Sequence, residues 1–382
     1  MESKIDLLGA SAQYDICRSC GGSATNRVKD VLDRWIYPAV RPDGKRIALL
    51  KVLQTNVCEN DCYYCANRAG YDTPRATFTP DELARLFNEL AQRGRVQGLF
   101  LSSGMYGRSC RAMERILATV ELVRRRYDYR GYVHLKIMPG TQDAAIEQAV
   151  RLANRVSLNL EAPTPDRLAR ITRSKDLPHQ LLGPLRRAAL LAHESARDVS
   201  LTTQFVVGAA DEPDSELLGS AQRLYQQLGL ARAYYSAFQP LAPTPLEEHP
   251  PTPTWREHRL YQADFLLRRY GYGLDELVYG ADGNLPRALD PKQMWAAHHP
   301  EVFPIELNTA SETQLLRIPG IGPLTARRIV QKRADGRVRD LKQVALAGGS
   351  AGRAAPYVLL DGRRPSYQLP LWESAPDGAV SS

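Results

Sequence analysis

The sequence predicts a parallel α/β domain followed by a small all-α domain. Six short apolar runs rich in β-branched residues alternate with longer amphipathic segments from residue 46 onward. Parallel neighbouring strands need long crossover connections, so strands that alternate with helices indicate a parallel sheet. Near the C-terminus, a glycine-rich turn joins two helical segments that carry most of the net charge. That charge separation indicates a second domain with a polyanionic partner.

The expected strands are short, and helix signals lie between them. The strands cover residues 47–53, 98–101, 132–138, 155–160, 201–207 and 233–238. Helices are expected over residues 80–92, 111–127, 142–152 and 255–269. The first helix has the clearest start, because Thr79 is a good N-cap, Pro80 suits the first helical position and Glu82 completes a capping box. Periodicity leaves open whether the sheet is flat or curled into a partial barrel.

Composition shifts divide the chain into four expected segments. They are an N-terminal arm packing on the α/β domain (1–45), the α/β domain itself (46–290), a linker with the helical domain (291–365) and a flexible tail (366–382). Six prolines between residues 240 and 253 predict an ordered loop or strap.

The overall composition is that of a globular protein. The chain has 382 residues, 43% of them apolar and 24% charged. It has no long uncharged apolar run and no apolar signal-peptide core at its start, so we expect no membrane association and a cytoplasmic location. Thiols stay reduced in the cytoplasm, which favours metal ligation over disulfides for clustered cysteines.

The net charge of +8 is concentrated in one region. Residues 307–364 contain eleven basic and four acidic residues, a local excess of +7. The basic residues are Arg317, Arg327, Arg328, Lys332, Arg333, Arg337, Arg339, Lys342, Arg353, Arg363 and Arg364. A nucleic acid is the natural partner of such a segregated charge.

Three cysteines follow the first expected strand at the spacing C-x3-C-x2-C. Cys58, Cys62 and Cys65 lie on one loop and can converge on one metal centre. Thiolates are the ligands that iron–sulfur clusters require. A structural zinc ion normally takes four protein ligands, so three favour a cluster with one iron left open.

This loop resembles the hallmark of the radical S-adenosylmethionine (radical SAM) superfamily. The resemblance implies a partial (β/α)6 TIM-type barrel over about residues 46–269. It also implies a [4Fe–4S] cluster on the three cysteines and S-adenosylmethionine on the open iron. An external electron donor would reduce the cluster, which then splits S-adenosylmethionine into methionine and a 5′-deoxyadenosyl radical.

The same resemblance implies positions that contact S-adenosylmethionine at the C-terminal ends of strands, where barrel enzymes keep their active sites. These positions are Tyr64, Ser102, Ser103, Gly104, Asn159, Glu161 and Gly208. The superfamily usually has an acidic residue in the turn at 101–104, and this sequence has none. The serines and backbone carbonyls of that turn would then accept the hydrogen bonds from the methionine amino group.

The segment 315–329 resembles a helix-hairpin-helix DNA-binding motif. Glycines permit a sharp turn, and the first amides of the next helix offer an anion site. The residues expected to contact nucleic acid are Gly320, Gly322, Leu324, Thr325, Arg327 and Arg328. A second, degraded hairpin is expected at residues 347–349, with residues 352–358 as its second helix.

The combination of cysteine loop and hairpin resembles a family of radical SAM proteins named for DNA modification or repair. A family name of this kind fixes no reaction. The leading hypothesis is therefore a radical SAM enzyme that acts on DNA. The first alternative is the same chemistry on RNA, a nucleotide or a protein, and the second is a non-enzymatic DNA-binding protein with a structural cluster.

Four smaller signals carry separate hypotheses. Cys17 and Cys20 form a C-x2-C pair that is either two thiols of a flexible arm, which we favour, or extra metal ligands. With Cys110, they are candidates for a fourth cluster ligand. His134 and Lys136 alternate on the third expected strand as candidate substrate contacts. The segment Gln368–Trp372 resembles peptides that bind the sliding clamp of bacterial replication, which makes the clamp a candidate partner.

Overall fold

A computed structural model describes residues 2–12, 34–40, 46–107 and 110–366. The chain forms two compact units, residues 1–257 and 258–382, and each is described by itself. The described residues contain no helix that is long and apolar enough to cross a membrane.

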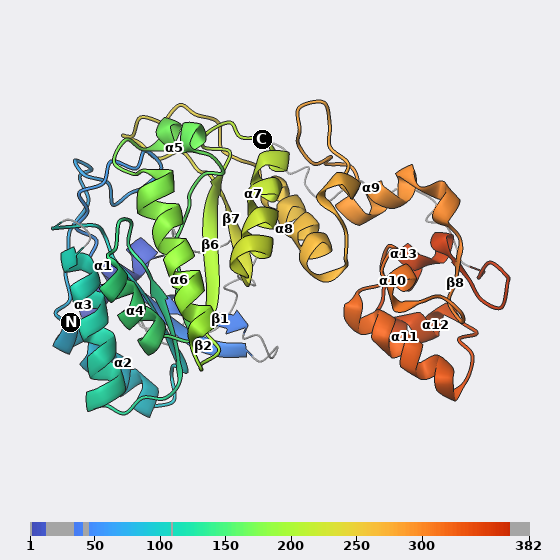
Figure 1. The fold of residues 1–382 in the computed structure, drawn as a ribbon, viewed down its shortest axis with the longest axis horizontal. Helices are drawn as coiled ribbons and strands as arrows, with labels where there is room; N and C mark the ends of the chain where they lie inside the picture. Colours follow the sequence, from blue (N-terminus) through green and yellow to red (C-terminus); the bar gives the residue numbers. More distant parts are fainter. Residues whose placement is uncertain (1, 13–33, 41–45, 108–109, 367–382) are drawn as a thin grey trace. The chain divides into compact units, whose positions relative to one another are not determined.

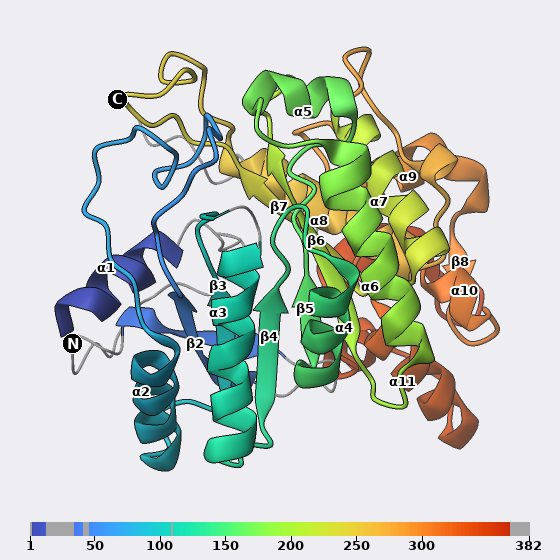
Figure 2. The same ribbon diagram turned by 60° about the vertical axis from the view of Figure 1, so that its left-hand side comes forward.

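The first unit is built on a seven-stranded sheet whose spatial order follows the sequence order (Figures 1 and 2). The strands are β1 (Ile36–Val40), β2 (Arg46–Leu53), β3 (Gly98–Ser102), β4 (Tyr132–Lys136), β5 (Arg155–Ser157), β6 (Ser200–Val207) and β7 (Arg232–Ala237). Strands β2 to β7 all run parallel to one another. The six predicted strands and their parallel arrangement are confirmed, and the sheet is curled into a partial barrel.

The antiparallel edge strand β1 was not predicted. It pairs with β2 from Ile36 opposite Leu50 to Val40 opposite Arg46. Pro38 lies inside this strand, and a proline within an apolar run normally counts against a strand. It is tolerated here because β1 is an edge strand whose outer backbone groups have no ladder to complete.

Helices of the first unit cover the outer side of the sheet (Figure 2). They are α2 (Pro80–Gln92), α3 (Cys110–Glu121) with the π-helical η3 (Leu122–Arg126), α4 (Asp143–Leu152), α5 (Pro165–Ile171), η4 (Leu177–Leu182), α6 (Gly183–Glu194) and α7 (Asp214–Leu228). The next helix, α8 (Thr254–Arg269), begins in the first unit and ends in the second. The predicted capping box of α2 is present, with the Thr79 and Glu82 side chains each bonding the other residue's backbone N–H.

An N-terminal helix, α1 (Glu2–Ala12), contacts β2. Ile5, Leu8 and Ala12 are buried on its inner side. Lys4 forms an ion pair with Glu82 at 3.0 Å. The described part of the N-terminal arm is therefore packed on the barrel.

The second unit contains short helices around its own apolar core. Its elements are η5 (Leu274–Glu276), α9 (Pro291–His298), η6 (Pro300–Val302), β8 (Ile305–Glu306), α10 (Glu312–Leu315), α11 (Pro323–Asp335), α12 (Leu341–Leu346), α13 (Ala351–Ala354), η7 (Ala355–Tyr357) and β9 (Val358–Leu359). The β8–β9 pair is parallel and only two residues long, so this helical unit also contains a small strand pair that was not predicted.

Residues 258–290 belong to the second unit, although the sequence placed them with the barrel. The Arg317 guanidinium lies 4.0 Å from the ring centroid of Tyr272 and 4.8 Å from that of Trp295. Arg317 also forms an ion pair with Glu276 at 2.5 Å. These contacts join the segment that includes Tyr272 and Glu276 to the hairpin. They could not be predicted from the composition of that segment.

Candidate functional site

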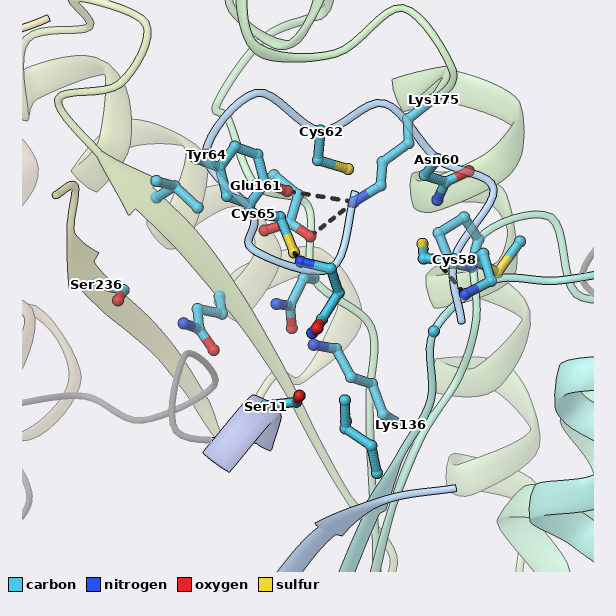
Figure 3. Close-up of a pocket in the computed structure, with 18 of the residues that line it drawn as sticks. Ser11, Cys58, Asn60, Cys62, Tyr64, Cys65, Lys136, Glu161, Lys175 and Ser236 are labelled. Atoms are coloured by element: carbon cyan, nitrogen blue, oxygen red, sulfur yellow. Dashed lines mark hydrogen bonds and ion pairs between the residues drawn. The ribbon is translucent and has the colours of Figure 1, made fainter. Parts of the chain in front are cut away.

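The three-cysteine loop connects β2 to α2 and lies at the C-terminal ends of the parallel strands. Cys58, Cys62 and Cys65 all line one cavity of about 630 Å³ in the first unit (Figure 3). Cys62 is buried, and the other two are partly exposed. Burial, and next the electrostatic interaction with Cys62, raise the pKa of the Cys65 thiol to about 12.

A single arginine holds the backbone of this loop. The Arg75 guanidinium donates hydrogen bonds to four carbonyl oxygens, at distances of 2.5 to 3.0 Å. The acceptors are Asn56, Asn67, Arg68 and Tyr71. These positions flank the three cysteines on both sides, so one side chain closes the loop around them.

Replacing Arg75 with alanine is expected to loosen the loop and lower cluster incorporation. A lysine has one ammonium group and cannot bond four separated carbonyls, so Arg75→Lys should fall between alanine and wild type. Loss of the charged hydrogen bonds should cost roughly 2 kcal/mol or more in the unfolding free energy of the apo-protein. Iron and sulfide per chain after reconstitution, together with thermal unfolding, measure both effects. Arg85→Ala, at an exposed position of α2, is the matched control, and a wild-type iron content in Arg75→Ala would contradict the prediction.

The turn after β3 packs directly against the cysteine loop. A Cβ atom on Gly104 would lie 2.2 Å from the Val57 carbonyl oxygen, so only glycine allows this approach. The Met105 amide donates to the Cys58 Sγ at 3.4 Å, and the Asn67 amide donates to the Cys65 Sγ at 3.4 Å. Amide donors to sulfur are one means by which proteins tune iron–sulfur centres.

The donor set fits an iron–sulfur cluster. No group of three or more His, Cys, Asp or Glu side chains among the described residues is arranged to hold one metal ion. A four-iron cluster takes its ligands on separate irons, so three cysteines spaced around one cavity suit it better than a lone zinc ion. Cys110 is exposed and does not line the cavity, so within the part of the chain that the structure describes no fourth cysteine joins the three.

A buried ion pair lies in the same cavity. Lys175 Nζ is 3.0 Å from Glu161 Oε1 and 3.3 Å from the Tyr64 hydroxyl (Figure 3). Burial, and next the electrostatic interaction with Cys62, raise the pKa of Tyr64 well above its usual value, which keeps its hydroxyl protonated. Glu161 has a φ of +64°, a left-handed conformation that is rare for a residue with a side chain and often marks a functional site.

The second unit contains the predicted glycine turn between α10 and α11. Gly320 has a φ of +86°, and a Cβ atom there would lie 2.7 Å from the Ser350 carbonyl oxygen. Lys292 Nζ donates to the Ile321 carbonyl oxygen at 2.6 Å. A lysine from the segment predicted as a linker therefore supports the turn, although no sequence signal singled it out.

A second hairpin lies beside the first. Helices α12 and α13 are joined by a turn in which Gly348 has a φ of +92°. The Ser350 amide donates to the Gly320 carbonyl oxygen at 2.9 Å, so the two turns are bonded to each other. The predicted second helix, residues 352–358, is a short α-helix, Ala351–Ala354, continued by one 3-10 turn.

The expected nucleic-acid residues differ in exposure. The Arg327 side chain is 61% exposed and Leu324 is 55% exposed. Thr325 is 4% exposed and packs against Gly349, where a Cβ atom would meet its Cγ2 at 2.9 Å. Arg328 donates to the Ala347 carbonyl oxygen at 3.3 Å. Thr325 and Arg328 thus connect the two hairpins, whereas Leu324 and Arg327 face solvent.

Family models match both parts of the chain. Residues 52–224 match the radical SAM superfamily. The chain contains a radical SAM domain. Residues 303–347 match the helix-hairpin-helix motif, so the chain carries a hairpin motif on the C-terminal side of its radical SAM domain. Enzymes of the superfamily use a [4Fe–4S] cluster and S-adenosylmethionine.

Solved structures similar to this radical SAM protein share little sequence with it. HydG, a maturase of the [FeFe]-hydrogenase, is 15% identical with a TM-score of 0.46, over 56% of this chain and 48% of that one. Methylornithine synthase (PylB) is 13% identical with a TM-score of 0.46, over 57% and 61%. The anSMEcpe protein with bound AdoMet is 10% identical with a TM-score of 0.38, over 78% and 99%. The chain thus spans about half the length of HydG, and a comparison with curated proteins finds no match.

Five of the seven positions expected to contact S-adenosylmethionine line the cavity of the radical SAM domain. They are Tyr64, Ser103, Gly104, Asn159 and Glu161. Ser102 is buried in β3 and does not line it. Gly208 does not line it either, and a Cβ atom there would meet Thr252 Oγ1 at 2.1 Å, so packing against Thr252 also requires a glycine.

Some polar residues of the cavity were not predicted, and only one of the two candidate substrate contacts on β4 lines it. Lys175, Gln204 and Ser236 line the cavity but were not predicted. Lys136 lines it, at the end away from Cys62 together with Ser11 (Figure 3). His134 does not: it is buried and bonded to Ser157 Oγ at 2.8 Å. Cys17, Cys20 and the segment Gln368–Trp372 lie outside the described residues.

Proposed function

We propose that this radical SAM enzyme modifies or repairs DNA, with the cluster on Cys58, Cys62 and Cys65. The observation that carries the proposal is the pairing of a three-cysteine cavity with a basic unit of two bonded hairpins in one chain. When bound and reduced, the cluster supplies the cleavage of S-adenosylmethionine that produces a hydrogen-abstracting 5′-deoxyadenosyl radical.

Within the cavity, this chain's residues would bind and orient the cosubstrate. Asn159 and Glu161 would contact its ribose and methionine, with Tyr64 beside the adenine. Ser103 and the backbone of Gly104 would accept from the methionine amino group. The cavity volume of about 630 Å³ is within the range of roughly 300–1,000 Å³ common for small-molecule sites. A duplex does not fit into a cavity of this size, so the reacting nucleotide would have to leave the base stack to enter it.

The hairpin unit would bind the DNA backbone. Hairpin amides at the start of α11 and the exposed Arg327 side chain are suited to phosphate oxygens. Such contacts are largely blind to sequence, so the hairpins would position the substrate and the cavity would select the reacting nucleotide. Gly322, the N-cap of α11, and Leu324, just inside that helix, would lie at the same surface.

We expect 5′-deoxyadenosine release to depend on DNA. Reconstituted protein with dithionite should produce 5′-deoxyadenosine and methionine, and duplex or single-stranded DNA should raise the yield more than RNA of the same sequence. Product analysis by chromatography and mass spectrometry measures the yield. Stimulation by RNA, a nucleotide or a protein substrate in place of DNA would shift the assignment to the first alternative. A cluster that remains stable but never cleaves S-adenosylmethionine would favour the non-enzymatic alternative.

Two partners complete the proposal. A low-potential electron donor must reduce the cluster, because the reaction consumes an electron. The sliding clamp stays a predicted partner through Gln368–Trp372, on the ground of its glutamine and two apolar anchors.

A further inference from the structure

Lys175 is a buried charged residue that lines the same cavity as the three cysteines. Its side chain is 7% exposed and that of Glu161 is 8% exposed. Removing two charges from water is costly, and a sequence keeps such a pair only where geometry or function compensates for that cost. Figure 3 shows the Lys175 side chain reaching into the space between Cys62, Cys65 and Glu161.

The cysteine loop itself determines where Lys175 lies. Asp61, next to Cys62, accepts hydrogen bonds from Thr172 Oγ1 at 2.7 Å and from the backbone amides of Arg173 and Ser174 at 3.1 Å. The Tyr63 amide donates to the Ile171 carbonyl oxygen at 2.9 Å. The segment that ends in Lys175 is therefore tied to the loop that carries the ligands.

Backbone hydrogen bonds also fix Glu161, the ion-pair partner of Lys175. The Glu161 amide donates to the Gln204 carbonyl oxygen at 3.0 Å, and its own carbonyl accepts from the Val206 amide at 2.8 Å. These bonds hold Glu161 against β6 in its left-handed conformation. The ammonium group is thus fixed from both sides, by Glu161 and by the Tyr64 hydroxyl.

A fixed positive charge changes the ease of reduction of a nearby cluster. Three thiolates give the site negative charge, and one-electron reduction adds more. A cation in a poorly solvated site stabilises the reduced form, and net charge is one determinant of iron–sulfur potentials. We propose that Lys175 is a positioning residue that raises the reduction potential of the cluster by holding its ammonium group beside the cysteines. The inference rests on the proposed cluster site and goes beyond it by assigning the residue that sets its redox behaviour.

The test is a redox titration of reconstituted wild type, Lys175→Met, Lys175→Arg and the double variant Glu161→Gln/Lys175→Met. The double variant leaves no unpaired buried charge, so it covers the case in which Lys175→Met alone fails to fold. We expect the equilibrium constant for reduction to fall about tenfold, which is about 59 mV for one electron, in Lys175→Met. The double variant also loses the negative charge of Glu161, so its potential should fall by a smaller amount. Lys175→Arg keeps the charge and should stay near wild type.

A second readout separates redox tuning from binding of S-adenosylmethionine. If the lysine acts on the potential, the stronger reductant Ti(III) citrate should restore to Lys175→Met most of the 5′-deoxyadenosine yield that it loses with dithionite. A Lys175→Met protein with a full cluster and an unchanged midpoint potential overturns the inference and leaves the proposed function standing. Wild-type protein that assembles no cluster overturns both.

Discussion

Cys62→Ala is expected to abolish the reductive cleavage of S-adenosylmethionine. Cys62 is the most buried of the three cysteines and the middle one of the loop. Within the described residues no cysteine beyond Cys58, Cys62 and Cys65 lines the cavity, so no replacement ligand is present there. The loss should reach at least about a thousandfold in 5′-deoxyadenosine yield, the scale expected when a metal site that carries the chemistry is dismantled.

The matched control is Cys110→Ala, an exposed cysteine outside the cavity. It should keep the iron content, the visible absorption of the cluster and the yield of wild type. Iron analysis and product chromatography on the two variants, side by side, provide the measurement. Equal yields from Cys62→Ala and wild type would remove the three-cysteine site as the basis of the activity.

Gly320→Ala is expected to disrupt the paired hairpins and with them DNA binding. Alanine at a φ of +86° is strained, and its Cβ atom would lie 2.7 Å from the Ser350 backbone oxygen and 3.0 Å from Arg353 Cβ. The cost should be roughly 1–3 kcal/mol in the stability of the second unit. Because the contacted atom is backbone, the turn itself must shift. We expect at least about a tenfold loss of affinity for duplex DNA, corresponding to about 1.4 kcal/mol.

Gly352→Ala is the control, since no atom lies within 4 Å of a Cβ there. It should leave both thermal unfolding and DNA affinity near wild type. Arg327→Ala tests the contact itself without disturbing the fold, because this side chain is 61% exposed. Fluorescence anisotropy over a range of salt concentrations gives the slope of log affinity against log salt concentration. In Arg327→Ala this slope should be smaller by about 0.9, the value for one lost phosphate contact. If Arg327→Ala leaves the salt slope unchanged and Gly320→Ala leaves the affinity unchanged, the hairpins do not bind the DNA.

Local signals predicted most of the architecture. The capping residues of α2 and the six β-branched runs act over a few residues, and the structure contains them nearly where expected. Strand ends were less well predicted: β4 and β5 stop at Lys136 and Ser157. The residues just beyond those points, Ile137 and Met138 after β4 and Leu158 and Asn159 after β5, line the cavity. Strand β1 was not predicted because it contains Pro38, and proline normally counts against a strand. The residue opposite Pro38 is Ala48, ten residues later.

Spacing also predicted the three-cysteine loop, since ligands within eight residues need no tertiary fold to be recognised. It could not predict the residues that hold or adjoin that loop. Arg75 acts on carbonyls up to nineteen residues away, and Lys175 lies more than a hundred residues after the cysteines. Spacing also gave no sign that Gly208 packs against Thr252, where a Cβ atom would meet the Thr252 hydroxyl.

By itself, the sequence determined the parallel α/β architecture, the cysteine triplet and the basic hairpin, because each depends on residues close together in the chain. Only the tertiary structure decided which polar side chains share the cavity, that Lys175 and Glu161 meet inside it, and that the two hairpins are bonded through Ser350 and Gly320. These contacts join segments distant in sequence. Their physical basis is the burial of charge and the close approach of backbones, which no local pattern encodes.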